Sequence, residues 1–94
     1  MPALTYTRAA IRALEFLAGP CADRVLHCQV RRALDKLAAD LRHPGLRTRR
    51  HHAVPGRLRE AVYGSYVGTG SGWRIRWIRT DGGGIEVVAI VPHP

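Results

Sequence analysis

Closely spaced arginines dominate the two stretches of this sequence whose residue types could do chemistry. The stretch LRTRRHHAVPGR holds Arg47, Arg49 and Arg50, followed by two histidines. The stretch WRIRWIRT holds Arg74 and Arg76, two positions apart. A guanidinium is a planar fork of donors that fits a phosphate group or the edge of a base. Both stretches therefore indicate contact with phosphate groups of the kind found in nucleic acids.

The charge of the whole chain points the same way. Fifteen Lys and Arg side chains stand against seven Asp and Glu, which gives a formal net charge of +8, and fourteen of the fifteen bases are Arg. A high-GC genome that favours arginine codons is the alternative explanation for this bias. A folded domain this basic is expected to have polyanions among its partners, and it also attracts acidic proteins.

Metal chemistry is not supported by the spacing of the possible ligands. His51 and His52 are adjacent, the cysteines at 21 and 28 lie far from them in sequence, and the acids are scattered. No pattern typical of a zinc or other metal site results. We therefore expect no metal ion and no cofactor.

Three predicted strands would position the second arginine stretch. They cover Glu60 to Val67, Trp73 to Thr80 and Ile85 to Val91, which are rich in β-branched and aromatic residues. The glycine-rich stretches between these segments begin no helix, so they are predicted to be turns and not phosphate-binding loops.

The middle strand alternates between two kinds of side chain. Because successive side chains of a strand point to opposite faces, this strand has one aromatic and apolar face and one face with arginines. The two faces are Trp73, Ile75 and Trp77 on one side, and Arg74, Arg76 and Ile78 on the other. The first set is expected in the core, which leaves the second set open.

Two helices are predicted before these strands. Ala3 to Thr7 fits a short strand, and Thr7 fits the N-cap of a first helix that ends at Gly19. A second helix is predicted over Cys21 to Leu41, with Pro20 in its first turn. Apolar residues recur at helical spacing in both segments: Ile11, Leu14 and Leu17, then Leu26, Val30, Ala33, Leu34, Leu37 and Leu41.

The predicted fold is an α+β two-layer domain with the order β-α-α-β-β-β. The tight connection between the helices predicts an antiparallel helical hairpin, packed on an antiparallel sheet. The length of 94 residues predicts a single domain over residues 1–94.

This order resembles the RelE/ParE superfamily of toxins from bacterial toxin–antitoxin pairs. LRHPGL at the end of the second helix is similar to a passage of those toxins, and so is the strand motif Trp73-Arg74-Ile75-Arg76-Trp77. The apolar last strand, VVAIVPHP, closes on His93 as theirs closes on a C-terminal histidine. The resemblance covers essentially the whole chain.

The resemblance implies roles for Arg74 and His93, and strand spacing adds Arg76. RelE-like members cut mRNA, mostly on the ribosome, by driving the ribose 2′-OH at the adjacent phosphate. Arg74 matches the arginine that those members aim at the scissile phosphate, and Arg76 would complete a clamp. His93 matches a general acid or base, and the ordinary pKa of histidine, close to neutrality, suits either task. The alternatives are two solvated arginines and an exposed residue near the chain end.

Further residues are candidates for RNA contact. The basic link would form a rim that binds phosphate, and either of its histidines would be a second proton carrier; a solvated loop is the alternative. The rim consists of Arg47, Arg49, Arg50 and His52, with His51 beside them. Tyr66 could stack on a base, although packing explains it as well.

One departure from the family concerns an acid. Some members that cut RNA carry a Glu or Asp in or just after the basic link, whereas residues 47–59 contain none here. Glu60 is the nearest candidate for a base or for a group that orients the histidine. The missing acid favours two alternatives: a ParE-like inhibitor of DNA gyrase, or a basic RNA-binding module without catalysis.

The expected partners are mRNA, the ribosome and an acidic antitoxin. The N-terminal stretch is interrupted by Arg8, Arg12 and Glu15, so neither a signal peptide nor a membrane span is expected. Cys21 and Cys28 on one helix would lie about 10 Å apart, too far for a disulfide. We therefore predict a cytoplasmic protein.

Overall fold

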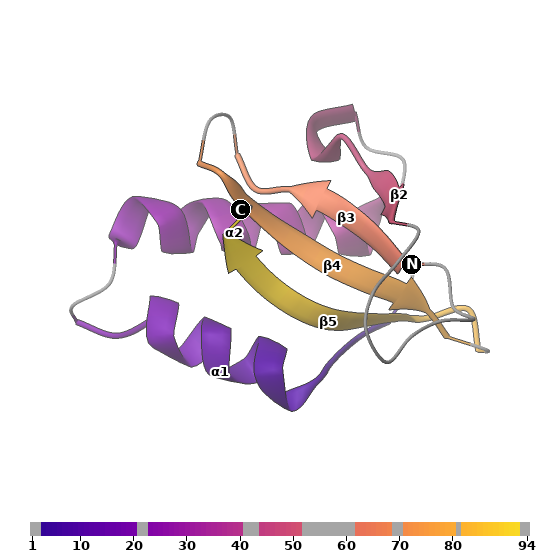
Figure 1. Ribbon diagram of the computed structural model, residues 1–94, viewed down its shortest axis with the longest axis horizontal. Coiled ribbons are helices and arrows are strands. Elements are labelled where there is room, and N and C mark those ends of the chain that lie inside the picture. Colours follow the sequence, from indigo (N-terminus) through magenta and orange to yellow (C-terminus); the bar gives the residue numbers. More distant parts are fainter. Residues whose placement is uncertain are drawn as a thin grey trace.

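Two helices cover one face of a five-stranded sheet (Figure 1). The computed structural model describes residues 3–20, 23–40, 44–51, 62–68, 71–80 and 82–92, and at positions 50 and 51 it describes the main chain alone. Its elements are β1 (Leu4–Tyr6), α1 (Arg8–Leu17), α2 (Arg24–Ala39), the 3-10 helix η1 (Pro44–Leu46), β2 (Arg49–His51), β3 (Val62–Tyr66), β4 (Trp73–Arg79) and β5 (Ile85–Pro92).

The predicted α+β two-layer fold is confirmed, and the sheet differs from the expected antiparallel one in two respects. Its order is β1-β5-β4-β3-β2, and β1 runs parallel to β5, with Leu4 opposite Ile85. The remaining pairs are antiparallel. The sheet also gains β2 within the basic link, which the sequence predicts to be a loop because it has little to bury. Main-chain pairing with β3 forms this strand, and such pairing needs no apolar side chain.

Helix α1 begins as predicted. Thr7 is its N-cap: its Oγ1 accepts from the N–H of Ala10 at 3.2 Å and donates to the carbonyl of Val88 at 2.6 Å, which ties the helix start to β5. The buried face is formed by Ala10 and Leu17, whereas Ile11, expected in the core, is 44% exposed. The helix therefore turns a partly alanine face toward the sheet, which allows a close approach.

Helix α2 supplies the predicted apolar face but begins later than expected. Asp23 is its N-cap and accepts from the N–H groups of Val25 and Leu26, so the helix starts at Arg24. The expected first residue, Cys21, and the expected last one, Leu41, lie outside the described residues. The buried residues are Val30, Ala33, Leu34 and Leu37. α1 and α2 are in contact and run in opposite directions (Figure 1), as the predicted hairpin requires.

The three long strands lie where the sequence predicts them, and β4 separates its two faces. Ile75 and Trp77 are buried against the helices, and Trp77 stacks on Tyr63 with ring centroids 4.6 Å apart. The side chains of Arg74 and Arg76 point to the sheet face that the helices leave open, because they alternate with this pair.

None of the helices in the described ranges is long and apolar enough to cross a membrane.

Candidate nucleic-acid interface

Cross-strand partners arrange the open face of the sheet in rows. Directly paired residues of neighbouring strands point to the same face, so the register assigns each side chain to a row. The first row is Tyr66, Arg74 and Val91; the second is Arg49, Gly64, Arg76 and Ala89; the third is Val62, Ile78 and Glu86. The first two rows carry the cations. The third is largely apolar, and its Val62 and Ile78 are buried, contrary to the expectation that Ile78 is open, although the helices do not cover this face.

The guanidinium of Arg74 is held against Tyr66. Its Cζ lies 4.4 Å from the centroid of the tyrosine ring, and its Nη2 donates to the tyrosine hydroxyl at 2.7 Å. A cation over an aromatic face is attracted by the ring quadrupole, and the hydrogen bond fixes the orientation of the fork. The contact therefore presents Arg74 in one position, although both partners are only half-buried.

Two arginine atoms on this face have no acceptor. The Nε of Arg74 and the Nε of Arg76 are buried, and no hydrogen bond reaches either one within the described part of the chain. A buried donor without a partner costs about 1–3 kcal/mol, so native proteins seldom keep one. Two such donors on neighbouring rows indicate a surface suited to a ligand rich in acceptors, such as a phosphate.

Pairing of β2 with β3 brings a third arginine to this face. Arg49 is opposite Gly64, which is opposite Arg76, so one residue without a side chain separates the two arginine positions. Their Cα atoms lie two strand spacings apart, about 10 Å. Arg49 is exposed, which suits a contact with an approaching ligand. Arg49 of the basic link thus shares a row with Arg76, and its contact with RNA stays a prediction.

A buried network fixes the strand that carries Arg49. Ser65 is completely buried; it accepts from the Nε1 of Trp77 at 2.9 Å and shares a hydrogen bond of 2.8 Å with the hydroxyl of Thr48. Just before Thr48, Arg47 has φ of 46°, in the left-handed region that side chains other than glycine seldom adopt. The basic link is therefore held to the core through one hydroxyl and enters β2 through a strained residue.

The structure does not place the other predicted site residues beside Arg74 and Arg76. Glu60, His52 and His93 lie outside the described residues, so their roles stay predictions. Arg50 is opposite Tyr63 in the strand pairing, and its main chain alone is described. Arg47 is exposed at the beginning of the link.

The open face also carries Glu86, which the sequence pattern does not single out. Glu86, half-buried on β5, is opposite Ile78, and it is the only acidic residue on the described strands. It lies in a strand that reads as apolar, so only its position in the register connects it with the arginine rows. Within the described ranges, no group of three His, Cys, Asp or Glu is placed to hold a metal ion.

The sequence matches no protein-family model and no curated protein. The fold is similar to that of the YoeB dimer from Staphylococcus aureus, with a TM-score of 0.65 at 12% sequence identity, over 99% of this chain and 98% of that one. This likeness confirms the predicted fold.

Proposed function

We propose that this chain, which has the fold of YoeB, is the toxin of a type II toxin–antitoxin pair and an endoribonuclease that cuts mRNA at the ribosome. The observation that carries the proposal is the arginine pair on the open face. Arg74 is oriented by Tyr66, Arg76 lies on the next row, and each has a buried Nε without an acceptor among the described residues. A phosphodiester brings the oxygens that these donors lack.

The proposed reaction needs no metal ion. The ribose 2′-oxygen attacks the adjacent phosphorus and the bond to the 5′-oxygen breaks, which leaves a 2′,3′-cyclic phosphate and a 5′-hydroxyl. A base takes the proton of the 2′-hydroxyl, an acid gives a proton to the leaving 5′-oxygen, and cations stabilise the charge on the phosphate. Arg74 and Arg76 would supply this stabilisation, and Arg49 would hold the neighbouring backbone.

The proton carriers are assigned from the sequence. His93 is proposed as the acid or the base, Glu60 as its counterpart or orienting group, and His52 as a second carrier. Tyr66 is proposed to contact RNA beside Arg74, although its ring is already engaged by that guanidinium. Arg47 and Arg50 would complete the phosphate-binding rim.

The proposed partners follow from the same surface. The net charge of +8 suits the ribosome and mRNA, and an acidic antitoxin would neutralise the toxin.

Inhibition of DNA gyrase is the second candidate function. The absence of any acid in residues 47–59 favours it, because a ParE-like inhibitor needs no proton carrier. A supercoiling assay with purified protein and gyrase separates the two functions, since inhibition is expected only from the gyrase inhibitor. An RNA-binding module without catalysis would give neither inhibition nor cleavage.

Induced expression in a bacterial host tests the proposal directly. Growth arrest with new cleavage ends, mapped by primer extension on a reporter mRNA, is the expected result for the parent chain. Arg74→Ala and His93→Ala should each relieve arrest and remove the ends. Arg79→Ala is the matched control, because Arg79 is exposed on the same strand and outside the cationic rows.

Two other outcomes contradict the nuclease, and a third contradicts its site. Arrest with intact mRNA would point to gyrase, and normal growth would leave a binding module. Cleavage that persists in both variants would show that the site is assigned to the wrong residues.

A further inference from the structure

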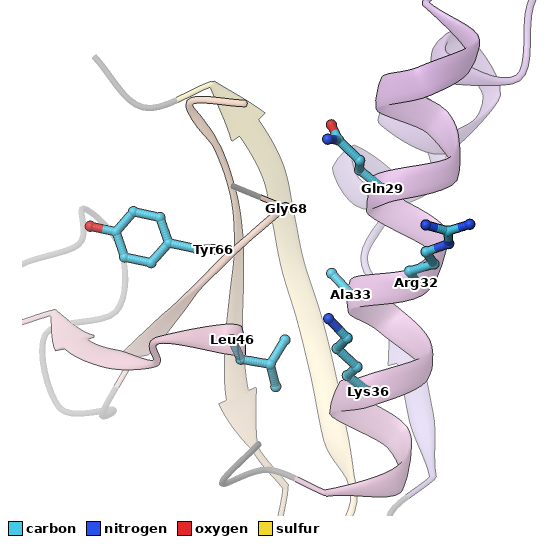
Figure 2. A pocket seen from close by; sticks show the side chains of 7 residues that line it. All are labelled: Gln29, Arg32, Ala33, Lys36, Leu46, Tyr66 and Gly68. Carbon is cyan, nitrogen blue, oxygen red and sulfur yellow. The ribbon is translucent and has the colours of Figure 1, made fainter. Parts of the chain in front are cut away.

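A second cationic surface lies on α2, away from the arginine rows. A groove of about 310 Å³ runs between this helix and the end of β3 (Figure 2). It is lined by Gln29, Arg32, Ala33, Lys36, Leu46, Tyr66 and Gly68. In Figure 2 the ring of Tyr66 points away from α2, so the groove and the Arg74 site lie on opposite sides of this residue.

The charge of the groove is one-sided. Arg32 and Lys36 are exposed and four positions apart on α2, so two like charges lie on one helix face, an arrangement that disfavours an isolated helix. No acid is among the lining residues of the described chain, and Asp35, next to Lys36 in sequence, does not line the groove. An anionic ligand would remove this repulsion.

A neighbouring hollow extends the groove toward the start of α2. It measures about 360 Å³, shares Gln29 and Arg32 with the groove, and adds Arg24, Val25 and Cys28. Val25 is 66% exposed, so the hollow offers an apolar side chain to a ligand beside its cations. The combined surface therefore carries the cations Arg24, Arg32 and Lys36 along one helix, with the exposed side chain of Val25 at its start.

Gly68 lines the groove just after β3. Gly68 has φ of 60°, and a Cβ at this position would lie 2.9 Å from the side chain of Gln29. Any other residue would therefore strain the turn and press on the groove wall. Leu46, which has no exposed surface, supplies an apolar floor.

We propose that this α2 groove binds a short acidic peptide segment that carries at least one apolar side chain. Carboxylates of the segment would meet Arg24, Arg32 and Lys36, and its apolar side chain would cover Val25, which is exposed beside them. From Arg24 to Lys36 the helix rises about 18 Å, which an extended segment of about six residues spans.

A peptide fits the groove better than RNA does. Recognition of single-stranded RNA depends on aromatic rings that stack on bases; Tyr66 is the one aromatic residue among the described residues that line the two hollows, and its ring points away from α2 (Figure 2). The exposed apolar surface around Val25 has no counterpart in a phosphate backbone. The inference does not depend on the proposed nuclease activity, because none of the cations in the groove belongs to the arginine rows of the open face.

The exposed thiol of Cys28 is a natural reporter for this site. In a Cys21→Ser background it is the only cysteine, so its rate of reaction with a maleimide reports cover of the groove. The probe is a synthetic peptide of alternating Glu and Leu residues, and its control is the same peptide with Gln in place of Glu. We expect the acidic peptide to slow the reaction saturably and the Gln peptide to have little effect.

Matched variants assign the effect to the groove. Arg32→Ala combined with Lys36→Ala should weaken protection by about tenfold or more, as expected for the loss of charge-assisted contacts. Arg8→Ala combined with Arg12→Ala on α1 removes the same net charge from exposed positions and should leave protection unchanged.

The proposal is overturned by any of three results. One is equal weakening by the two double variants, which would indicate attraction by net charge alone. Another is equal protection by the Glu and Gln peptides. The third is protection by oligouridine without protection by the acidic peptide, which would make the groove an RNA contact.

Discussion

On the face of β4 that the helices cover, the indole Nε1 of Trp77 donates to the buried hydroxyl of Ser65. On the open face of the same strand, the Nε atoms of Arg74 and Arg76 are buried without an acceptor in the described chain. Buried polar groups are normally satisfied, so the first face has the chemistry of a finished core. The second face keeps two buried donors without an acceptor in the described chain, as a surface suited to an acceptor-rich ligand would. One strand thus has a satisfied polar contact on the side facing the helices and, among the described residues, two unsatisfied donors on the other side.

The largest effect on stability is expected at Trp77. Trp77→Ala removes a fully buried ring and its stacking on Tyr63, and it should lower the free energy of unfolding by about 3–5 kcal/mol. Urea denaturation measures the loss. Trp73→Ala, at a half-buried position on the same face, should cost clearly less. Equal losses would contradict the central place of Trp77 in this face.

Arg74 should show the opposite behaviour. Arg74→Ala should reduce cleavage of an RNA substrate by about 10²–10³-fold, the range typical of removing one donor to a transition state. Its unfolding free energy should stay within about 1 kcal/mol of the parent, because the lost contact with Tyr66 is modest and an unsatisfied donor disappears. A large loss of stability without loss of cleavage would reverse the comparison between the faces.

Ser65 connects the core face with the basic link. Ser65→Ala leaves the Nε1 of Trp77 and the hydroxyl of Thr48 without their shared partner, which should cost about 1–3 kcal/mol in unfolding free energy. Thr48→Val removes one end of the network and should cost less. The double variant should cost less than the sum of the two, as coupled residues do. Strict additivity in thermal or urea unfolding would argue against the network.

Tyr66 tests the two parts of the contact with Arg74. Tyr66→Phe keeps the ring and removes the hydrogen bond, so we expect a loss of about 0.5–1.5 kcal/mol. Tyr66→Leu also removes the ring and should cost about 0.5–1 kcal/mol more. Denaturation of the two variants measures the difference. If the Phe and Leu variants lose the same unfolding free energy, the ring contact with Arg74 contributes nothing to stability.

The smallest effect is expected at Arg49. Arg49→Ala should weaken RNA binding uniformly across sequences and reduce the slope of log affinity against log salt by about one, as for one phosphate contact. Fluorescence anisotropy at several salt concentrations measures the slope. An unchanged slope would place Arg49 outside the interface in spite of its row with Arg76.

Local patterns were sufficient to predict most of the elements. Period-two alternation identified β4 and the two faces it separates, and the Thr7 cap identified the start of α1. The helical repeat identified α2, although its first turn was placed too early because Asp23 caps more strongly than the preceding residues suggest. These signals are local, since a helix face or a strand face depends on residues a few positions apart.

Strand β2 shows where local patterns fail. Nothing in the apolar pattern around Arg49 predicts a strand, because its formation depends on the free edge of β3. The same pairing turns Arg49 toward the row of Arg76. In the sequence Arg49 and Arg76 lie in two separate basic stretches, and nothing local shows that they share a face.

The sequence by itself determined the basic charge, the order of the main elements and the placement of Arg74 and Arg76 on one side of a strand. These follow from composition and from periodicities of two or a few residues. Only the tertiary structure decided that Tyr66 orients Arg74, that Arg49 joins their face, and that Arg32 and Lys36 line a groove with Leu46 and Gly68. The physical reason is that strand register and helix–sheet packing join residues far apart in the chain, and no local repeat encodes such contacts.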